Sequence, residues 1–132
     1  MKAKVLVLLA VAALLFGAAS CASRLPEDGG EGSVVIHYYR ADGDYSNWDL
    51  WVWPSEPNEE GQGYAFGSAG ADGFVTSGIP MASFVTEIGF IVRQGGDGWS
   101  DKDIADDRFS RAKEIWLLSG DPTVYTAKPA IK

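Results

Sequence analysis

The stretch Trp48-Asp49-Leu50-Trp51-Val52-Trp53-Pro54 constrains the fold most, because it reads as one β-strand with bulky apolar side chains on both faces. Side chains alternate between the two faces of a strand. One face is then wholly apolar and suits a core: Trp48, Leu50 and Val52. The other face places Asp49 beside two indoles: Trp51 and Trp53. The strand therefore requires a sheet that buries at least its first face.

The second face of this strand has two possible surroundings. Indoles at i and i+2 stand roughly 7 Å apart, given the rise of a strand. Exposed apolar patches of this size usually mark binding sites, and a flat aromatic platform beside polar groups suits stacking on the C–H faces of a sugar. Alternatively, Trp51 and Trp53 belong to the core of a strand that is buried on both sides. The strand alone leaves both interpretations open.

The rest of the chain reads as further short strands separated by glycine-rich turns. Runs of β-branched and aromatic residues predict these strands: 34–39, 64–66, 74–76 (ended by Gly78-Ile79-Pro80), 87–93, 114–118 and 124–126. The charged segment 99–111 is irregular, with one helical turn around Asp103 to Asp106. No long helical pattern occurs. The sequence therefore predicts an all-β fold, an antiparallel, immunoglobulin-like β-sandwich of about seven to eight short strands.

The N-terminus carries an export signal. Lys2 and Lys4 precede the apolar run from Val5 to Phe16, which small residues connect to Cys21. This order predicts a signal peptide over 1–20, and the run is shorter than the roughly 20 residues of a transmembrane span. The position of Cys21 resembles the lipidation site of bacterial lipoproteins, although Ala18 stands where that pattern usually has Leu, Val or Ile. Ordinary cleavage after Ser20 or Ala22 is the alternative.

These boundaries divide the chain into three parts. Residues 22–32 are polar and glycine-rich and predict a flexible linker, and residues 33–130 form one domain. With Cys21 acylated, the protein is expected to be exported and held on a bacterial membrane, facing the periplasm or the cell surface. Without the lipid, it is expected to be secreted. The membrane is a partner only through this anchor.

Composition excludes several classes of partner and site. The net charge is −7 and the pI is near 4.5, which argues against nucleic acid and anionic membrane surfaces. One cysteine cannot form an intramolecular disulfide, and one histidine excludes a site built from several histidines. No metal and no cofactor are expected. Asp42-x-Asp44-x-Ser46 resembles the opening of a calcium loop, but that loop needs Gly and Glu where Asn47 and Trp53 stand, so a turn is predicted.

Catalysis finds no suitable constellation. A nucleophilic triad needs a histidine held by a third group, whereas His37 is expected to be a half-exposed strand residue and Cys21 belongs to the export signal. A glycosidase needs two carboxylates across a cleft, but the pairs Glu59-Glu60 and Asp106-Asp107 point apart. No catalytic residue is assigned, and the chain is not expected to be an enzyme.

The segment from Trp99 to Phe109 supplies polar groups beside a third tryptophan. Aromatic faces can stack on a sugar while Lys and Asp fix its hydroxyls by charge-assisted hydrogen bonds. The alternative is a solvated loop whose Trp99 folds back onto the core. The segment alone decides neither.

A set of motifs in a fixed order closely resembles the pullulanase-associated domain, family 41 of the carbohydrate-binding modules. The motifs run from residue 34 to about 129 and are His37 to Arg40, Trp48 to Trp53, Gly89 to Arg93, Trp99 to Asp103, Asp107 to Phe109, Glu114 to Leu117 and Gly120 to Tyr125. The resemblance implies a β-sandwich that binds α-glucans such as pullulan, amylose, maltooligosaccharides and glycogen.

The resemblance also implies site residues. Trp51 and Trp53 match the paired tryptophans of the family, and Trp99 matches its third stacking residue. Lys102 and Asp107 match its polar pair, with Asp103 as a competitor for the second position.

Modules of this family normally precede a glycoside hydrolase domain, and none follows Lys132 in this sequence. The resemblance therefore does not carry pullulanase activity over to this chain. Two interpretations stay open. The chain is a free-standing, envelope-tethered binding module that can act beside a separate glycoside hydrolase, or it is the N-terminal fragment of a pullulanase-type enzyme. An interaction lipoprotein whose aromatic face meets a protein partner is a third hypothesis.

Overall fold

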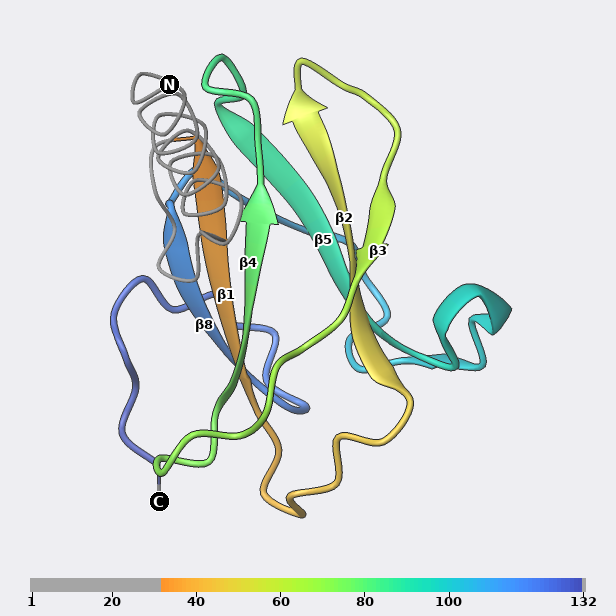
Figure 1. Ribbon diagram of the computed structural model, residues 1–132, viewed down its shortest axis with the longest axis vertical. Helices are drawn as coiled ribbons and strands as arrows, with labels where there is room; N and C mark the ends of the chain where they lie inside the picture. The colour runs from red at the N-terminus through yellow and green to blue at the C-terminus, as the bar shows by residue number, and fades with distance from the viewer. Residues whose placement is uncertain (1–31, 132) are drawn as a thin grey trace, which may run out of the picture.

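Two facing β-sheets make up the computed structural model, which describes residues 32–131 (Figure 1). The strands are β1 (Ser33–Tyr39), β2 (Trp48–Glu56), β3 (Gln62–Tyr64), β4 (Val75–Pro80), β5 (Glu87–Gln94), β6 (Asp101–Lys102), β7 (Arg108–Ser110) and β8 (Glu114–Leu118). A 3-10 turn, η1 (Gly96–Gly98), follows β5. The predicted signal peptide, the lipidation site at Cys21 and the linker up to residue 31 lie outside the described residues.

The strand order gives a sandwich of one small and one larger sheet. The first sheet has the order β4-β1-β8, and the second has the order β3-β2-β5-β6, with β7 also paired to β5. All of these pairs are antiparallel except β1 with β8, which run parallel. The predicted β-sandwich is therefore confirmed, with one parallel pair that joins the first and last strands. Such a pair needs a long crossover, and here the chain passes through β4 and the whole second sheet between β1 and β8.

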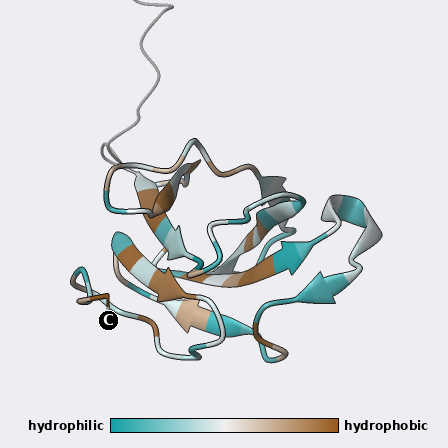
Figure 2. Ribbon diagram, turned by 90° about the horizontal axis from the view of Figure 1, so that it is seen from below, coloured by the Kyte–Doolittle hydropathy of each residue, from teal (hydrophilic) through white to brown (hydrophobic). Residues whose placement is uncertain are grey.

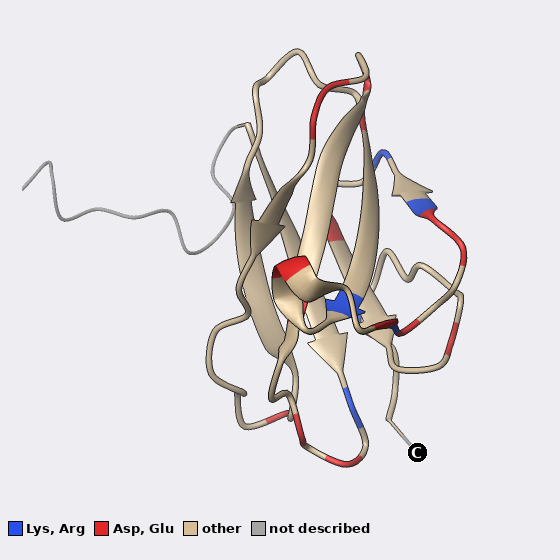
Figure 3. Cartoon of the chain, turned by 90° about the vertical axis from the view of Figure 1, so that its right-hand side faces the viewer, with Lys and Arg blue, Asp and Glu red and all other residues tan. Residues whose placement is uncertain are grey.

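The core lies between the sheets and uses the inward faces of β1, β2, β5 and β8. Leu50 and Val52 are fully buried, and Trp48 packs against the same cluster. This confirms the predicted apolar face of β2. Figure 2 shows that the strongly hydrophobic residues lie largely in the strands. Acidic residues lie mainly in the loops at the strand ends (Figure 3).

Four details of the predicted secondary structure differ from the structure. β3 ends at Tyr64, and Phe66 instead stacks on Tyr38 with ring centroids 5.4 Å apart. β4 does not end at Gly78, because residues 78–80 pair with the start of β1. Pro80 is tolerated because β4 lies at the edge of its sheet. The expected helical turn at 103–106 is absent from residues 32–131, and the final strand is a single bridge between Trp116 and Tyr125.

Candidate functional site

The outward face of β2 carries a pair of half-buried indoles. Trp51 and Trp53 lie on the face opposite the core residues Leu50 and Val52. The alternative that both tryptophans belong to the core is therefore wrong. Ile91 on β5 is the cross-strand partner of Trp51, is 7% exposed and lies beneath this surface. The outer face of the larger sheet thus has an apolar floor and two indoles above it.

Two glycines, one on β5 and one just before β3, make room for the two indoles. Trp53 pairs with Gly89, and a Cβ on Gly89 would overlap the indole ring of Trp53. A Cβ on Gly61 would lie 2.6 Å from Nε1 of Trp51. Each indole therefore rests on backbone where a side chain is missing, which fixes its position on the sheet.

Replacing Gly89 by alanine is expected to displace the Trp53 indole while every aromatic residue is kept. A binding site that depends on the placement of this ring should lose about tenfold in affinity, as expected for roughly 1.4 kcal/mol. Gly67→Ala is the matched control, because an added Cβ there lies 3.4 Å from its nearest neighbour, the Thr76 carbonyl oxygen. Unchanged ligand affinity in Gly89→Ala would show that the ring position is unimportant.

Trp99 stands upright beside Trp51. It follows η1, its φ of 50° lies in the left-handed region, and its side chain remains 37% exposed. The ring centroids of Trp51 and Trp99 are 5.6 Å apart, with an interplanar angle of 65°. Trp99 therefore extends the outer surface and does not fold back onto the core. A positive φ is strained for a bulky residue and is a feature of functional loops.

Arg93 connects the two indoles from below and was not assigned any role from the sequence. It is 2% exposed, and its guanidinium carbon lies 5.0 Å from the Trp51 ring centroid and 4.8 Å from that of Trp99. Nε donates to Asp49 Oδ1 at 2.7 Å, and Nη2 donates to Asp49 Oδ2 at 3.1 Å. Cation–π contacts of this kind stabilise ring positions.

The charge of this guanidinium and the space around it fit its buried position. Its hydrogen bonds to Asp49 raise the pKa of Arg93 above the ordinary arginine value, so the charge is permanent. Gly63 leaves the space, since a Cβ there would lie 2.5 Å from Nη2. Nη1 of Arg93 is buried and has no hydrogen-bond partner among residues 32–131. The signal that could have found Arg93 is its position opposite Asp49 on the face shared with Trp51.

The three predicted polar residues have different surroundings. Lys102 is exposed, with Nζ 5.9 Å from the Trp99 ring centroid. Asp107 is exposed and makes no hydrogen bond or ion pair within residues 32–131. Asp103 has a side chain only 5% exposed and accepts a hydrogen bond from Ser119 Oγ at 2.8 Å. Asp103 is therefore turned inward.

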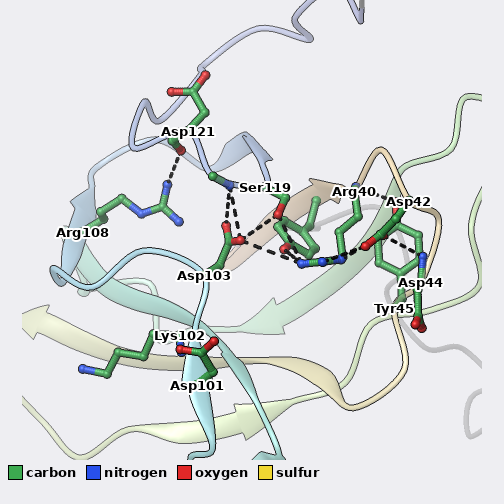
Figure 4. A network of polar contacts seen from close by, with 12 residues as sticks. Arg40, Asp42, Asp44, Tyr45, Asp101, Lys102, Asp103, Arg108, Ser119 and Asp121 are labelled. Atoms are coloured by element: carbon green, nitrogen blue, oxygen red, sulfur yellow. Dashed lines mark hydrogen bonds and ion pairs between the residues drawn. The ribbon is translucent and has the colours of Figure 1, made fainter.

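Figure 4 shows that Asp103 belongs to a network at one end of the sandwich. Its Oδ1 lies 3.9 Å from Arg40 Nη1, and Arg40 also donates to Tyr38 at 3.0 Å. Burial raises the pKa of Tyr38 to about 12, so its hydroxyl stays protonated at neutral pH. Lys102 lies apart from this network (Figure 4). The Asp103 carboxylate is thus bound to Ser119 and faces Arg40, so it is not available to a ligand at the aromatic surface.

Phe109 is a second residue that sequence reasoning left unassigned. It lies on β7 opposite Gly89, and half of its side chain is exposed. Its ring meets Trp53 with centroids 5.9 Å apart and an interplanar angle of 88°. Each of the paired tryptophans therefore has a second aromatic ring standing against it. The signal was the alternation along 108–110, in which Arg108 is buried and Phe109 faces outward.

The residues considered for other chemistry have structural partners. His37 lies on the opposite sheet, hydrogen-bonded to Thr76 at 2.7 Å and Glu114 at 2.8 Å and stacked on Trp116. Its side chain is 18% exposed, which is less than the predicted half. The 42–46 segment forms the predicted turns, because Asp42 accepts from the Asp44 amide and Asp44 accepts from the Ser46 amide.

Residues 32–131 contain no cluster of metal ligands and no helix that could span a membrane. No three His, Cys, Asp or Glu side chains come together as a metal site in this part of the chain. No helix in it is long and apolar enough to cross a bilayer.

Comparison with known proteins adds three findings. The family model described as "Bacterial pullanase-associated domain" matches residues 32–126. A solved chain of a multi-modular glycogen-degrading pneumococcal virulence factor, SpuA, in a product complex, is 27% identical with a TM-score of 0.58, over 72% of this chain and 10% of that one. A second solved chain is 23% identical and has the description "Alpha-glucan recognition by family 41 carbohydrate-binding modules from streptococcal virulence factors".

The second match has a TM-score of 0.55 and covers 73% of this chain and 47% of the other, so it supports the fold. The chain therefore spans about a tenth and just under half of these two solved chains. The family model, in contrast, spans both sheets and the whole aromatic surface.

Proposed function

This chain belongs to the family of bacterial pullulanase-associated domains, and on that premise we propose that it binds α-glucans without cleaving them. The observation that carries the proposal is the outward pair Trp51 and Trp53, with Trp99 standing against it at 65°. Flat indoles offer the C–H faces of glucose an apolar surface, and exposed aromatic patches of this kind mark binding sites.

The angle between the rings favours a curved glucan. Trp51 and Trp99 do not share a plane, so glucose units stacked on both rings must turn relative to each other. An α-1,4-linked chain is curved in this way, whereas a β-1,4-linked chain is extended and flat. The α-glucan recognition described for family 41 modules in one structural relative agrees with this preference. Pullulan, amylose, glycogen and maltooligosaccharides are the proposed ligands.

Lys102 and Asp107 are the proposed polar groups of the site. Lys102 lies beside Trp99, and Asp107 keeps its carboxylate free of partners within residues 32–131. Charge-assisted hydrogen bonds to sugar hydroxyls would then fix the orientation of a stacked unit. Because the surface is open and excludes little water, the affinity of a single module should be modest.

Affinity electrophoresis in native gels tests this proposal. The protein should be retarded in gels that contain pullulan or glycogen and should run freely in gels that contain hydroxyethyl cellulose. A double variant, Lys102→Ala with Asp107→Ala, should be retarded less while remaining folded. Equal migration of the parent in all gels would refute the proposed function.

Any hydrolysis is proposed to come from a separate glycoside hydrolase. The relative described as glycogen-degrading is a much longer chain, of which the present chain covers 10%. Purified protein incubated with pullulan should therefore release no reducing sugar. Release that survives repeated purification would instead favour the alternative of a fragment with pullulanase-type activity.

Export and a lipid tether at Cys21 complete the proposal. The order of basic, apolar and small residues before Cys21 supports it. Cys21→Ser in cells should move the protein from the membrane fraction to the soluble exported fraction, because the thiol that carries the lipid is lost. The parent appearing in the soluble fraction would contradict the anchor and would favour ordinary cleavage.

A further inference from the structure

Phe109 is a large apolar residue that is exposed and does not belong to the core cluster. Large apolar side chains are usually buried, and an exposed one that adjoins a binding surface is informative. Half of the Phe109 side chain is exposed, on the outer face of β7. The residue before it, Arg108, points inward and is buried. The fold therefore holds β7 with Arg108 and presents Phe109 outward.

The position of Phe109 continues the aromatic surface across the sheet. Trp53, Gly89 and Phe109 are register partners on three adjacent strands, β2, β5 and β7. Because Gly89 has no side chain, the Trp53 indole lies over it, in the direction of Phe109. The two rings then meet edge to face, with centroids 5.9 Å apart and an interplanar angle of 88°.

This arrangement repeats, at the other end of the pair, the contact of Trp99 with Trp51. That contact has centroids 5.6 Å apart and an angle of 65°. Trp99 comes from the loop after β5, whereas Phe109 comes from β7, at the opposite end of β5. Trp51 and Trp53 thus each have a second ring beside them that is steeply inclined to their own plane.

We propose that Phe109 forms an additional glucose subsite, which takes the unit next to the one stacked on Trp53. The proposal rests on the α-glucan binding proposed above. A unit on Phe109 must be turned strongly relative to a unit on Trp53, because the rings are nearly perpendicular. A curved α-linked chain can make this turn. The subsite therefore favours α-glucans long enough to pass beyond the two central tryptophans.

Calorimetric titration with maltotriose and maltohexaose tests the proposal. Maltotriose can cover Trp51 and Trp53, while maltohexaose also reaches a flanking ring. Phe109→Ala should weaken maltohexaose binding about three- to tenfold, the range expected for one aromatic contact, and should change maltotriose binding less than about twofold. Phe109→Trp should keep the tighter binding of the longer chain. Phe84→Ala, which removes a phenylalanine that is 62% exposed on the loop before β5, is the matched control.

The outcomes separate the two proposals. Equal weakening of both ligands in Phe109→Ala, or no weakening of either, would overturn the subsite while leaving α-glucan binding by the parent intact. A parent that binds neither ligand would overturn the proposed function and the subsite with it. Retained thermal unfolding midpoints in the phenylalanine variants confirm that a loss of affinity comes from the site.

Discussion

Trp53→Ala is expected to reduce the affinity for maltotetraose at least about 30-fold, which corresponds to about 2 kcal/mol or more for a central aromatic residue. The indole lies on Gly89, faces outward and meets the Phe109 ring at nearly a right angle. Its removal therefore deletes the stacking surface and the contact with the flanking ring. Trp51→Ala is expected to have a similar effect, because Trp99 rests against Trp51. Isothermal titration calorimetry of each variant gives the ratio directly.

The matched control for these variants is Trp116→Ala. Trp116 is also a half-buried tryptophan on a strand, but it lies on the opposite sheet and stacks on His37 with centroids 4.8 Å apart. The Trp116→Ala variant should lose some stability and keep its affinity for maltotetraose. If Trp51→Ala and Trp53→Ala bind as tightly as Trp116→Ala, the aromatic surface of the larger sheet is not the sugar site. Untouched glucan binding in Trp51→Ala would then favour a protein partner for this face.

Arg93→Ala is expected to lower the free energy of unfolding by about 2 kcal/mol, because the buried guanidinium loses its charged hydrogen bonds to Asp49, whose own side chain is 24% exposed. The guanidinium is 2% exposed and makes two hydrogen bonds to Asp49. Its loss also removes the cation beneath Trp51 and Trp99. Glucan affinity should therefore fall as well, even though Arg93 is too buried to touch a ligand. Urea unfolding followed by tryptophan fluorescence measures the first effect, and calorimetry measures the second.

Two comparisons make the Arg93 result specific. Arg111 also forms an ion pair, with Glu56 at 2.7 Å, but its side chain is largely exposed. Arg111→Ala should therefore cost much less stability than Arg93→Ala, because solvent screens an exposed pair. Arg93→Lys keeps the charge and loses the two-pronged bond to Asp49, so an intermediate stability is expected. An Arg93→Ala protein as stable as Arg111→Ala would show that the buried pair does not hold the site.

The alternation along β2 was the part of the site that a single sequence predicts well. Face-to-face alternation is a property of one strand, so Leu50 and Val52 could be assigned to the core without knowledge of any neighbour. The same pattern left Trp51 and Trp53 undecided. Whether a second face is covered depends on what packs against it, and the structure leaves Trp51 and Trp53 half-buried.

Contacts between strands were harder to predict. The pairing of Asp49 with Arg93 and of Trp53 with Gly89 depends on the register of β2 and β5, which is set by turns and packing along both strands. Once the register is known, the glycines beneath the indoles become meaningful.

The segment 99–111 was the least predictable because its charges have different fates. Asp103 and Asp107 are chemically identical in the sequence, yet Asp103 bonds Ser119 while Asp107 remains exposed. Only the approach of β8 and its following turn to this loop distinguishes them. The same folding places β7 so that Phe109 reaches Trp53.

Titration of the unmodified protein with maltotetraose and with cellotetraose tests the central claim most directly. The two ligands have the same composition and length and differ only in the linkage between glucose units. We expect measurable binding of maltotetraose, with the heat signal lost in Trp53→Ala, and no measurable binding of cellotetraose. Equal binding of both, or no binding of maltotetraose, would contradict an α-glucan site on this sheet.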